Sequence, residues 1–201
     1  MLRRHALYPL SYGRVERSSL ALLELRARIV TLPLGERFVI SRETQDDVSL
    51  VEVELRHDGV SGFGEAAPIA RYDQTAESAH AWLEQVDPGD DPFALEEIFD
   101  RLPPGEDAAR AALDHALHDL QGKLLGQPVW RLLGLRRAGP PTSWTVWLGD
   151  PDDMARRAEK ALGRFRRLKL KLGGGDGLDV ERVRAVRGVA GERCHQPDPA
   201  W

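Results

Sequence analysis

The stretch RLKLKLGGG, residues 167–175, decides the fold predicted for the second half of this 201-residue chain. Leucine alternates with a basic residue over six positions, and this period of two is typical of a β-strand. Side chains two residues apart lie on the same side of a strand, so Lys169 and Lys171 should share one face. The glycines that follow predict a flexible connection at the carboxyl end of the strand.

The two lysines are candidates for acid-base chemistry. They are two of only four lysines among 28 Lys and Arg residues. Lysine can lose its proton in a protein and arginine cannot, and two ammonium groups held close together make each other easier to deprotonate. The spacing alone also fits an ordinary solvated strand face, because short motifs give false positives.

The residues around this stretch predict alternating strands and helices. A strand is expected over 143–148, a helix opened by Asp150 and Pro151 up to 162, the lysine strand over 165–172 and a helix over 178–189. Such alternation predicts βαβ units with a parallel sheet, as at the start of an α/β (TIM-type) barrel, where reactive groups follow the carboxyl ends of strands. A complete barrel needs about 250 residues, so the barrel is expected to be incomplete in this chain.

The first half predicts a different, α+β unit. Strands over 23–29, 48–55 and 60–65, with a turn at 57–59, predict an antiparallel meander. Helices are expected over 75–86, capped by Thr75, over 91–101 and over 107–125. The apolar face predicted for the last helix comprises Ala109, Ala112, Leu113, Ala116, Leu117, Leu120 and Leu124. The expected organisation is an arm over 1–20, an α+β domain over 21–138 and barrel units over 139–201.

Composition excludes several classes of partner. The net charge of −4 is spread over mixed signs, so no nucleic acid is expected to bind. No apolar run approaches the roughly 20 residues of a membrane span, so no membrane is expected either. The single cysteine, Cys194, cannot form an internal disulfide, and the polar residues after the basic start do not indicate a signal peptide. A cytoplasmic location is expected.

Several segments together resemble the enolase superfamily. They are FGEAAP at 63–68, ALDHALHDL at 112–120 with GKLLGQP at 122–128, and KLK at 169–171. The resemblance is to the mandelate racemase/muconate-lactonizing branch, and within it to dipeptide epimerases such as L-Ala-D/L-Glu epimerase, which TSWT at 142–145 and PLGERFVISR at 33–42 also resemble. The likeness covers roughly residues 20 to 190, and it implies an N-terminal capping domain followed by the barrel.

The resemblance implies a role for both lysines. Such enzymes remove a proton beside a carboxylate while a divalent metal, here expected to be Mg²⁺, stabilises the enolate. Lys171 would be the base, and Lys169 would ease its deprotonation and contact the carboxylate. Thr145 matches a position that touches substrate, which is expected to be a dipeptide. By itself Thr145 is also an ordinary strand residue.

Three more residues match the mobile loop that covers the active site in this family. These are Phe38, Ser41 and Arg42, which would help to choose the substrate. Taken singly, Phe38 could instead be a core residue, and Ser41 and Arg42 could be parts of a solvated loop.

No metal ligand is expected in this chain. The family continues from the helix after the lysine strand into a strand that carries the first acidic ligand, whereas residues 190–201 read AGERCHQPDPAW. Pro197 and Pro199 cannot occupy a buried central strand, because each lacks a backbone donor. The hypothesis is a truncated or frame-shifted product, with the family ligands beyond Trp201 or in the altered tail.

Three weaker sites are also considered. His115 and His118, with Asp114 and Asp119, could form a metal pair on one helix, but a helix at a domain interface explains them without a metal and is the preferred interpretation. Cys194, His195 and Asp198 offer too few ligands for a closed structural zinc site. GGGDG at 173–177 lacks the Gly-Lys-Ser/Thr ending of a phosphate-binding loop.

The predicted function is metal-dependent epimerisation of a dipeptide, an isomerase activity. Muconate cycloisomerase or o-succinylbenzoate synthase chemistry is the alternative enzyme class, and a non-catalytic remnant or interaction module is the alternative outside catalysis. The chain alone is expected to be inactive, since no metal would stabilise the enolate. Open barrel edges that expose Trp144, Val146 and Leu170 are expected to favour self-association or aggregation.

Overall fold

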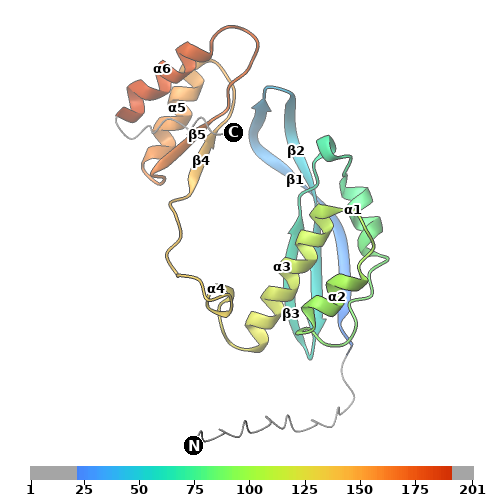
Figure 1. Cartoon of the computed structure of the whole chain (residues 1–201). Coiled ribbons are helices and arrows are strands. Elements are labelled where there is room, and N and C mark those ends of the chain that lie inside the picture. The colour runs from blue at the N-terminus through green and yellow to red at the C-terminus, as the bar shows by residue number, and fades with distance from the viewer. Residues whose placement is uncertain (1–21, 192–201) are drawn as a thin grey trace, which may run out of the picture.

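The computed structural model describes residues 22–191. The predicted N-terminal arm over 1–20, the two prolines of the tail and the Cys194, His195 and Asp198 cluster therefore lie outside the described residues. Figure 1 shows two parts, an α+β unit that contains most of the helices and a smaller unit formed by β4, α5, β5 and α6, joined by an extended connection after α4.

The first unit is built on the predicted meander. Strands β1 (Glu24–Ile40), β2 (Glu43–His57) and β3 (Val60–Ala66) form an antiparallel sheet in that order. The β2–β3 turn places both Asp58 and Gly59 at positive φ, at 49° and 79°. An Asp-Gly pair tolerates this conformation, which matches the twist of the flanking strands. The predicted turn and meander are confirmed.

Helices cover one face of this sheet (Figure 1). After the short 3-10 helix η1 (Ala70–Tyr72) come α1 (Ala76–Leu83), α2 (Leu95–Arg101), α3 (Asp107–Leu124) and α4 (Val129–Leu132). Thr75 caps α1 as predicted, since its hydroxyl accepts a hydrogen bond from the Ser78 amide and the Ser78 hydroxyl in turn accepts one from the Thr75 amide. Helices α1 and α2 are both shorter than predicted. No helix among residues 22–191 is long and apolar enough to cross a membrane.

The core of the first unit lies between the sheet and α3. Val51, Val53 and Leu55 point from β2 into a cluster that contains every predicted apolar residue of α3, of which all but the partly buried Leu124 are fully buried. Strand β3 lies directly against α3 at Gly64: a Cβ there would come within 1.9 Å of the Ala112 carbonyl oxygen. Glycine is required at this position because the two backbones touch.

The second unit has the predicted order of strand, helix, strand and helix. Strands β4 (Ser143–Val146) and β5 (Arg167–Leu170) pair in parallel, and helices α5 (Pro151–Leu162) and α6 (Asp179–Ala190) follow them. A separate small core joins the sheet to the helices and comprises Val146, Met154, Ala158 and Val186, with Leu168 and Leu170 against it. Within the described residues this sheet has two strands, so the barrel is incomplete and the predicted fold class is confirmed.

One expectation about the open strands is wrong. Val146 is fully buried and Leu170 is half-buried, because both face α5 and α6. Of the three predicted exposed residues, only Trp144 is exposed, at 39%, and its ring packs on Phe165 with the centroids 4.8 Å apart. A strand has two faces, and the helices of these βα units already cover the apolar one.

Candidate functional site

The ends of β4 and β5 bring three of the predicted site residues together. Thr145 and Lys169 are direct partners in the parallel register, so their side chains project side by side. Leu168 and Leu170 pack toward the helices, which leaves Lys169 exposed on the opposite face. Lys171 follows the last residue of β5; its backbone amide donates to the Val146 carbonyl oxygen at 2.9 Å, and its side chain is half-buried. The hydrogen-bond pairing with β4 thus extends one residue beyond β5, to Lys171.

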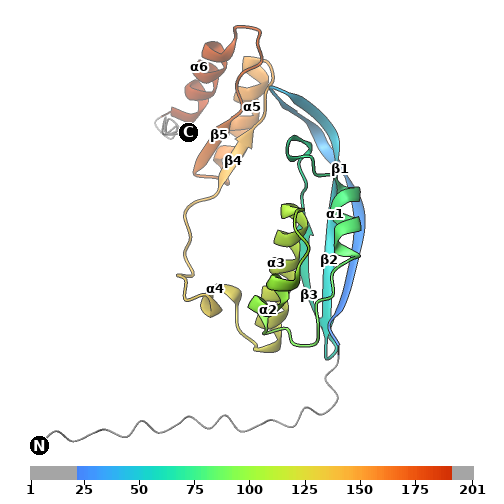
Figure 2. The same cartoon turned by 45° about the vertical axis from the view of Figure 1, so that its right-hand side comes forward.

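A long hairpin formed by β1 and β2 reaches from the first unit to these strand ends (Figure 2). Phe38 was predicted to lie in a loop, and this is wrong: it belongs to β1 and pairs with Gln45 of β2. The register shifts between Pro33 and Phe38, and the ladder then resumes. Ser41 and Arg42 form the exposed turn at the tip.

The tip contacts both loops that follow the barrel strands. The Leu148 amide donates to the Val39 carbonyl oxygen at 2.9 Å, and the rings of Phe38 and Trp147 lie 6.1 Å apart. Ser41 packs against Gly173, where an added Cβ would lie 3.4 Å from the serine Cβ. Ser41 is therefore close to the backbone two residues after Lys171. Arg42 shows no comparable contact with either loop within residues 22–191.

Charged residues reinforce this arrangement. Arg157 of α5 places its guanidinium 4.6 Å from the centre of the Trp147 ring, and its Nε lies 3.5 Å from Glu36 of the hairpin. Within the hairpin, Arg37 donates two hydrogen bonds to Asp46, at 2.8 and 3.2 Å, and these lower the pKa of Asp46. Sequence reasoning missed Trp147 and Arg157. The only available signal was the position of Trp147, two residues after Thr145 within the predicted strand over 143–148.

The loop after Lys171 is held by its own helix and does not have the form of a phosphate-binding loop. The Gly173 amide donates to Asp179 at 2.8 Å, and Arg182 of α6 binds Asp176. Hydrogen bonds from Arg182 and from the Leu178 amide lower the pKa of Asp176 to about 2. Sequence reasoning missed Arg182 as well.

The residues of the described range do not provide a magnesium site. No group of three or more His, Cys, Asp or Glu side chains within 22–191 is arranged to hold a metal. On α3, His118 contacts Asp114 of its own helix at 3.3 Å, and Asp119 accepts hydrogen bonds from Lys123 and from the Phe63 amide. The acidic partners of the proposed histidine pair are therefore already engaged within the domain.

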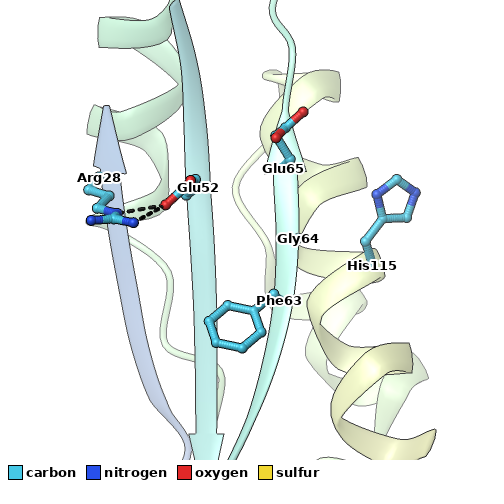
Figure 3. A pocket seen from close by; sticks show the side chains of 6 residues that line it. All are labelled: Arg28, Glu52, Phe63, Gly64, Glu65 and His115. Carbon is cyan, nitrogen blue, oxygen red and sulfur yellow. Dashed lines mark hydrogen bonds and ion pairs between the residues drawn. The ribbon is translucent and has the colours of Figure 1, made fainter. Parts of the chain in front are cut away.

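A cavity of about 580 Å³ lies elsewhere, on the open face of the first sheet (Figure 3). Arg28 donates to Glu52 across it at 2.6 Å. Of the residues considered as candidate sites from the sequence, only His115 of the weaker histidine pair lines this cavity, whose walls are Arg28, Glu52, Phe63, Gly64, Glu65 and His115.

Comparison with known proteins gives these features a family context. Residues 23–134 match the mandelate racemase / muconate lactonizing enzyme, N-terminal domain. The chain is 37% identical over 164 residues to an L-Ala-D/L-Glu epimerase of Bacteroides thetaiotaomicron, a match that covers 79% of this chain and 42% of the relative. The chain spans about half the length of the curated relatives it matches.

Two solved structures extend the comparison into the second unit. A dipeptide epimerase from Methylococcus capsulatus, complexed with Mg and the dipeptide L-Arg-D-Lys, aligns with a TM-score of 0.78 and 31% identity, over 87% of this chain and 52% of that one. A muconate lactonizing enzyme from Pseudomonas fluorescens, complexed with muconolactone, aligns with a TM-score of 0.79 and 28% identity, over 87% and 52% of the two chains.

Proposed function

The chain belongs to the mandelate racemase / muconate lactonizing enzyme family, and on that premise we propose that it carries the base-bearing part of a dipeptide epimerase. The observation that supports this most directly is the pairing of Thr145 with Lys169 at the end of a parallel sheet, with Lys171 directly after the strand and hydrogen-bonded through its backbone amide to Val146. Relatives that act on dipeptides match this chain through both of its units.

Lys171 is proposed as the base. Its Nζ takes the hydrogen from the carbon beside the substrate carboxylate, so that the C–H bond breaks and its electron pair passes into the enolate. Inversion is completed when an acid on the opposite face, which we do not assign to a residue within 22–191, donates a proton to that carbon. Lys169 is proposed to help keep Lys171 neutral and to contact the carboxylate.

The remaining proposed contacts come from β4 and from the hairpin. Thr145 is placed beside Lys169 and would touch the substrate. Phe38, Ser41 and Arg42 are proposed to select the dipeptide, and the packing of the hairpin on Trp147 and Gly173 supports this, since it holds the tip beside the strand ends.

The family's Mg²⁺ does not fit the donors available in residues 22–191, so we assign no step to it in this part of the chain. Stabilisation of the enolate needs ligands that these residues do not supply. We therefore propose that the 201-residue chain, tested alone, does not turn over a dipeptide.

A chimera tests the proposal. Residues 1–190 would be joined to the barrel segment of the Bacteroides thetaiotaomicron epimerase that follows its matched region. With Mg²⁺ in D₂O, NMR should show α-hydrogen exchange in L-Ala-L-Glu or L-Ala-D-Glu. Lys171→Ala should slow exchange by about 100-fold or more. Lys160→Ala, which removes the lysine of α5 on the surface, is the matched control and should keep the activity.

The outcomes separate the alternatives. If the chimera melts cooperatively, lactonises muconate and exchanges the α-hydrogen of neither dipeptide, cycloisomerase-type chemistry, including that of o-succinylbenzoate synthases, is favoured. The observation behind this second candidate is the similarity to the Pseudomonas fluorescens structure. A folded chimera with neither activity would favour the non-catalytic remnant or interaction module. Exchange by the 201-residue chain alone would contradict the proposed inactivity.

A further inference from the structure

Arg182 is a buried charge beside the proposed site that the proposed chemistry does not use. It lies in the first turns of α6, and only 3% of it is exposed. Among the described residues it is the one buried arginine or lysine. Burial of a charged group is unfavourable unless it is fully paired, so its partners reveal what it holds in place.

The guanidinium joins three segments of the chain. Its Nε donates to the carbonyl oxygen of Gly149, in the loop after β4, at 2.8 Å. Its Nη1 donates to Asp176, in the loop after β5, at 2.7 Å, and to Asp179 of α6 at 2.9 Å. Its Nη2 donates to the second oxygen of Asp176. A lysine has a single nitrogen in place of this fork and could not make all these contacts together.

Asp179 carries the connection back toward Lys171. One of its carboxylate oxygens accepts from Arg182 and the other accepts from the Gly173 amide at 2.8 Å. Gly174 is tightly enclosed: an added Cβ would lie 3.2 Å from the Arg182 Nη1 and 3.3 Å from a methyl carbon of Leu148. The loop after Lys171 therefore folds directly onto the guanidinium.

The electrostatics agree with this geometry. The hydrogen bonds with Asp176 are the main reason that the pKa of Arg182 is raised above its ordinary value, and burial acts in the opposite direction. Two carboxylates around one guanidinium need that positive charge, because without it they would repel each other. The cluster is thus a single ion-paired unit at neutral pH.

We propose that Arg182 is a positioning residue for Lys171: by joining the loops that follow β4 and β5, it fixes the ends of the two strands that carry Thr145 and the lysine pair. This inference rests on the proposed function for its catalytic meaning. The competing explanation is that Arg182 only stabilises the first turn of α6, where Asp179 is its helical neighbour.

Amide hydrogen exchange of the full 201-residue chain separates the two explanations. Arg182→Gln should accelerate exchange about tenfold in two segments at once, residues 147–150 and residues 171–175. Asp176→Asn should accelerate only the second segment, because the Arg182 bond to Gly149 remains. In Arg182→Lys, at least one of the two segments should still exchange faster than in the unsubstituted chain, because lysine cannot make all of the contacts together. Arg184→Gln, a neighbouring exposed arginine on α6, is the matched control and should change neither.

A chemical readout at Lys171 itself completes the test. Reductive methylation followed by peptide mass spectrometry measures each lysine separately. In Arg182→Gln, Lys171 should react roughly threefold faster relative to Lys160, since its half-buried side chain is no longer held. The exchange rates of α3 serve as an internal reference, because that helix belongs to the other hydrophobic core.

Acceleration confined to the first turn of α6, or an unchanged Lys171, would overturn the proposal. If Arg182→Gln accelerated exchange throughout residues 143–191, the Asp176→Asn variant would decide between the two explanations. Equal acceleration of both loops in Asp176→Asn would also overturn the proposal. These measurements need neither substrate nor metal. If the chimera is inactive but amide exchange follows the expected pattern, only the epimerase proposal is refuted. If the chimera is active but amide exchange does not follow that pattern, only the role of Arg182 is refuted.

Discussion

Replacement of Gly64 by alanine should strongly destabilise the first unit. The new Cβ would lie 1.9 Å from the Ala112 carbonyl oxygen and 2.8 Å from its carbonyl carbon, whereas real Cβ contacts essentially never fall below 3.0 Å. Strand β3 and helix α3 would therefore have to separate by about 1.1 Å to reach that minimum. Backbone atoms cannot rotate away as a side chain can, so the shift must be taken up by the whole helix.

The cost follows from what this shift does to the core. Leu113 and Leu117 of α3 are fully buried against the sheet, and a displaced helix loses close contact at both. Overpacking typically costs 1 to 3 kcal/mol, and we expect about 3 kcal/mol here because the obstacle is backbone. For a domain of this size that corresponds to a fall in Tm of about 10 °C.

Thermal and urea unfolding would measure the effect. Near-UV circular dichroism reports on the first unit through Trp82, which is buried in its core. Gly35→Ala is the control, since a Cβ at Gly35 meets nothing within 4 Å, and it should change the free energy of unfolding by less than about 0.5 kcal/mol. If Gly64→Ala were as stable as Gly35→Ala, β3 could not be packed on α3 as described.

Four further results are expected. Thr75→Ala removes the cap of α1 and should cost about 1 kcal/mol in urea unfolding; an unchanged midpoint would show that the cap does not form. Because the pKa of Asp176 is lowered in the folded chain, its contribution to stability is present above the unfolded carboxyl pKa near 4 and is lost as the pH falls toward 2. Acid titration followed by circular dichroism should show this loss of stability, and the Asp176→Asn variant should not show it. Phe38→Ala should speed amide exchange at Leu148, whose amide donates to Val39, and equal rates would argue against a docked hairpin. Unpaired edges of β4 and β5 should make the isolated chain associate, so light scattering that shows a monodisperse monomer would contradict this expectation.

Periodic signals in the sequence predicted most of the framework. The apolar positions of α3 repeat with helical spacing, and they are the residues buried against the sheet. The alternation of Leu168, Lys169 and Leu170 predicted a strand, and the alternation of strands with helices predicted that it would pair in parallel. Both patterns are local consequences of which face of an element is buried, so a single sequence is enough to read them.

The distal half of the hairpin could not be predicted in the same way. Glu36, Arg37, Asp46 and Asp47 give it the composition of a solvated loop, and an exposed two-stranded ribbon has no buried face to create an alternating pattern. Its order comes from cross-strand pairing and from its contact with Trp147 and the Leu148 amide. These partners lie more than 100 residues away in the chain.

Arg182 was hidden for a related reason. An arginine three residues after an aspartate on a helix usually marks a surface ion pair. The difference here is that the loop after β5 folds back over the helix and brings Asp176 to the same guanidinium. Burial of a charge of this kind depends on tertiary packing, and nothing in the spacing of residues 176–182 distinguishes it from an exposed pair.

The hairpin also has a mechanical consequence. The residues at its tip belong to the same continuous strands whose other ends are anchored in the first core, and Ala27 and Ile40 are separated by roughly 40 Å of strand. A ribbon of this length acts as a lever, so that a small change of tilt at its base becomes a larger displacement at its tip. Substitutions deep in the first sheet, far from any lysine, could therefore shift the tip relative to the ends of β4 and β5.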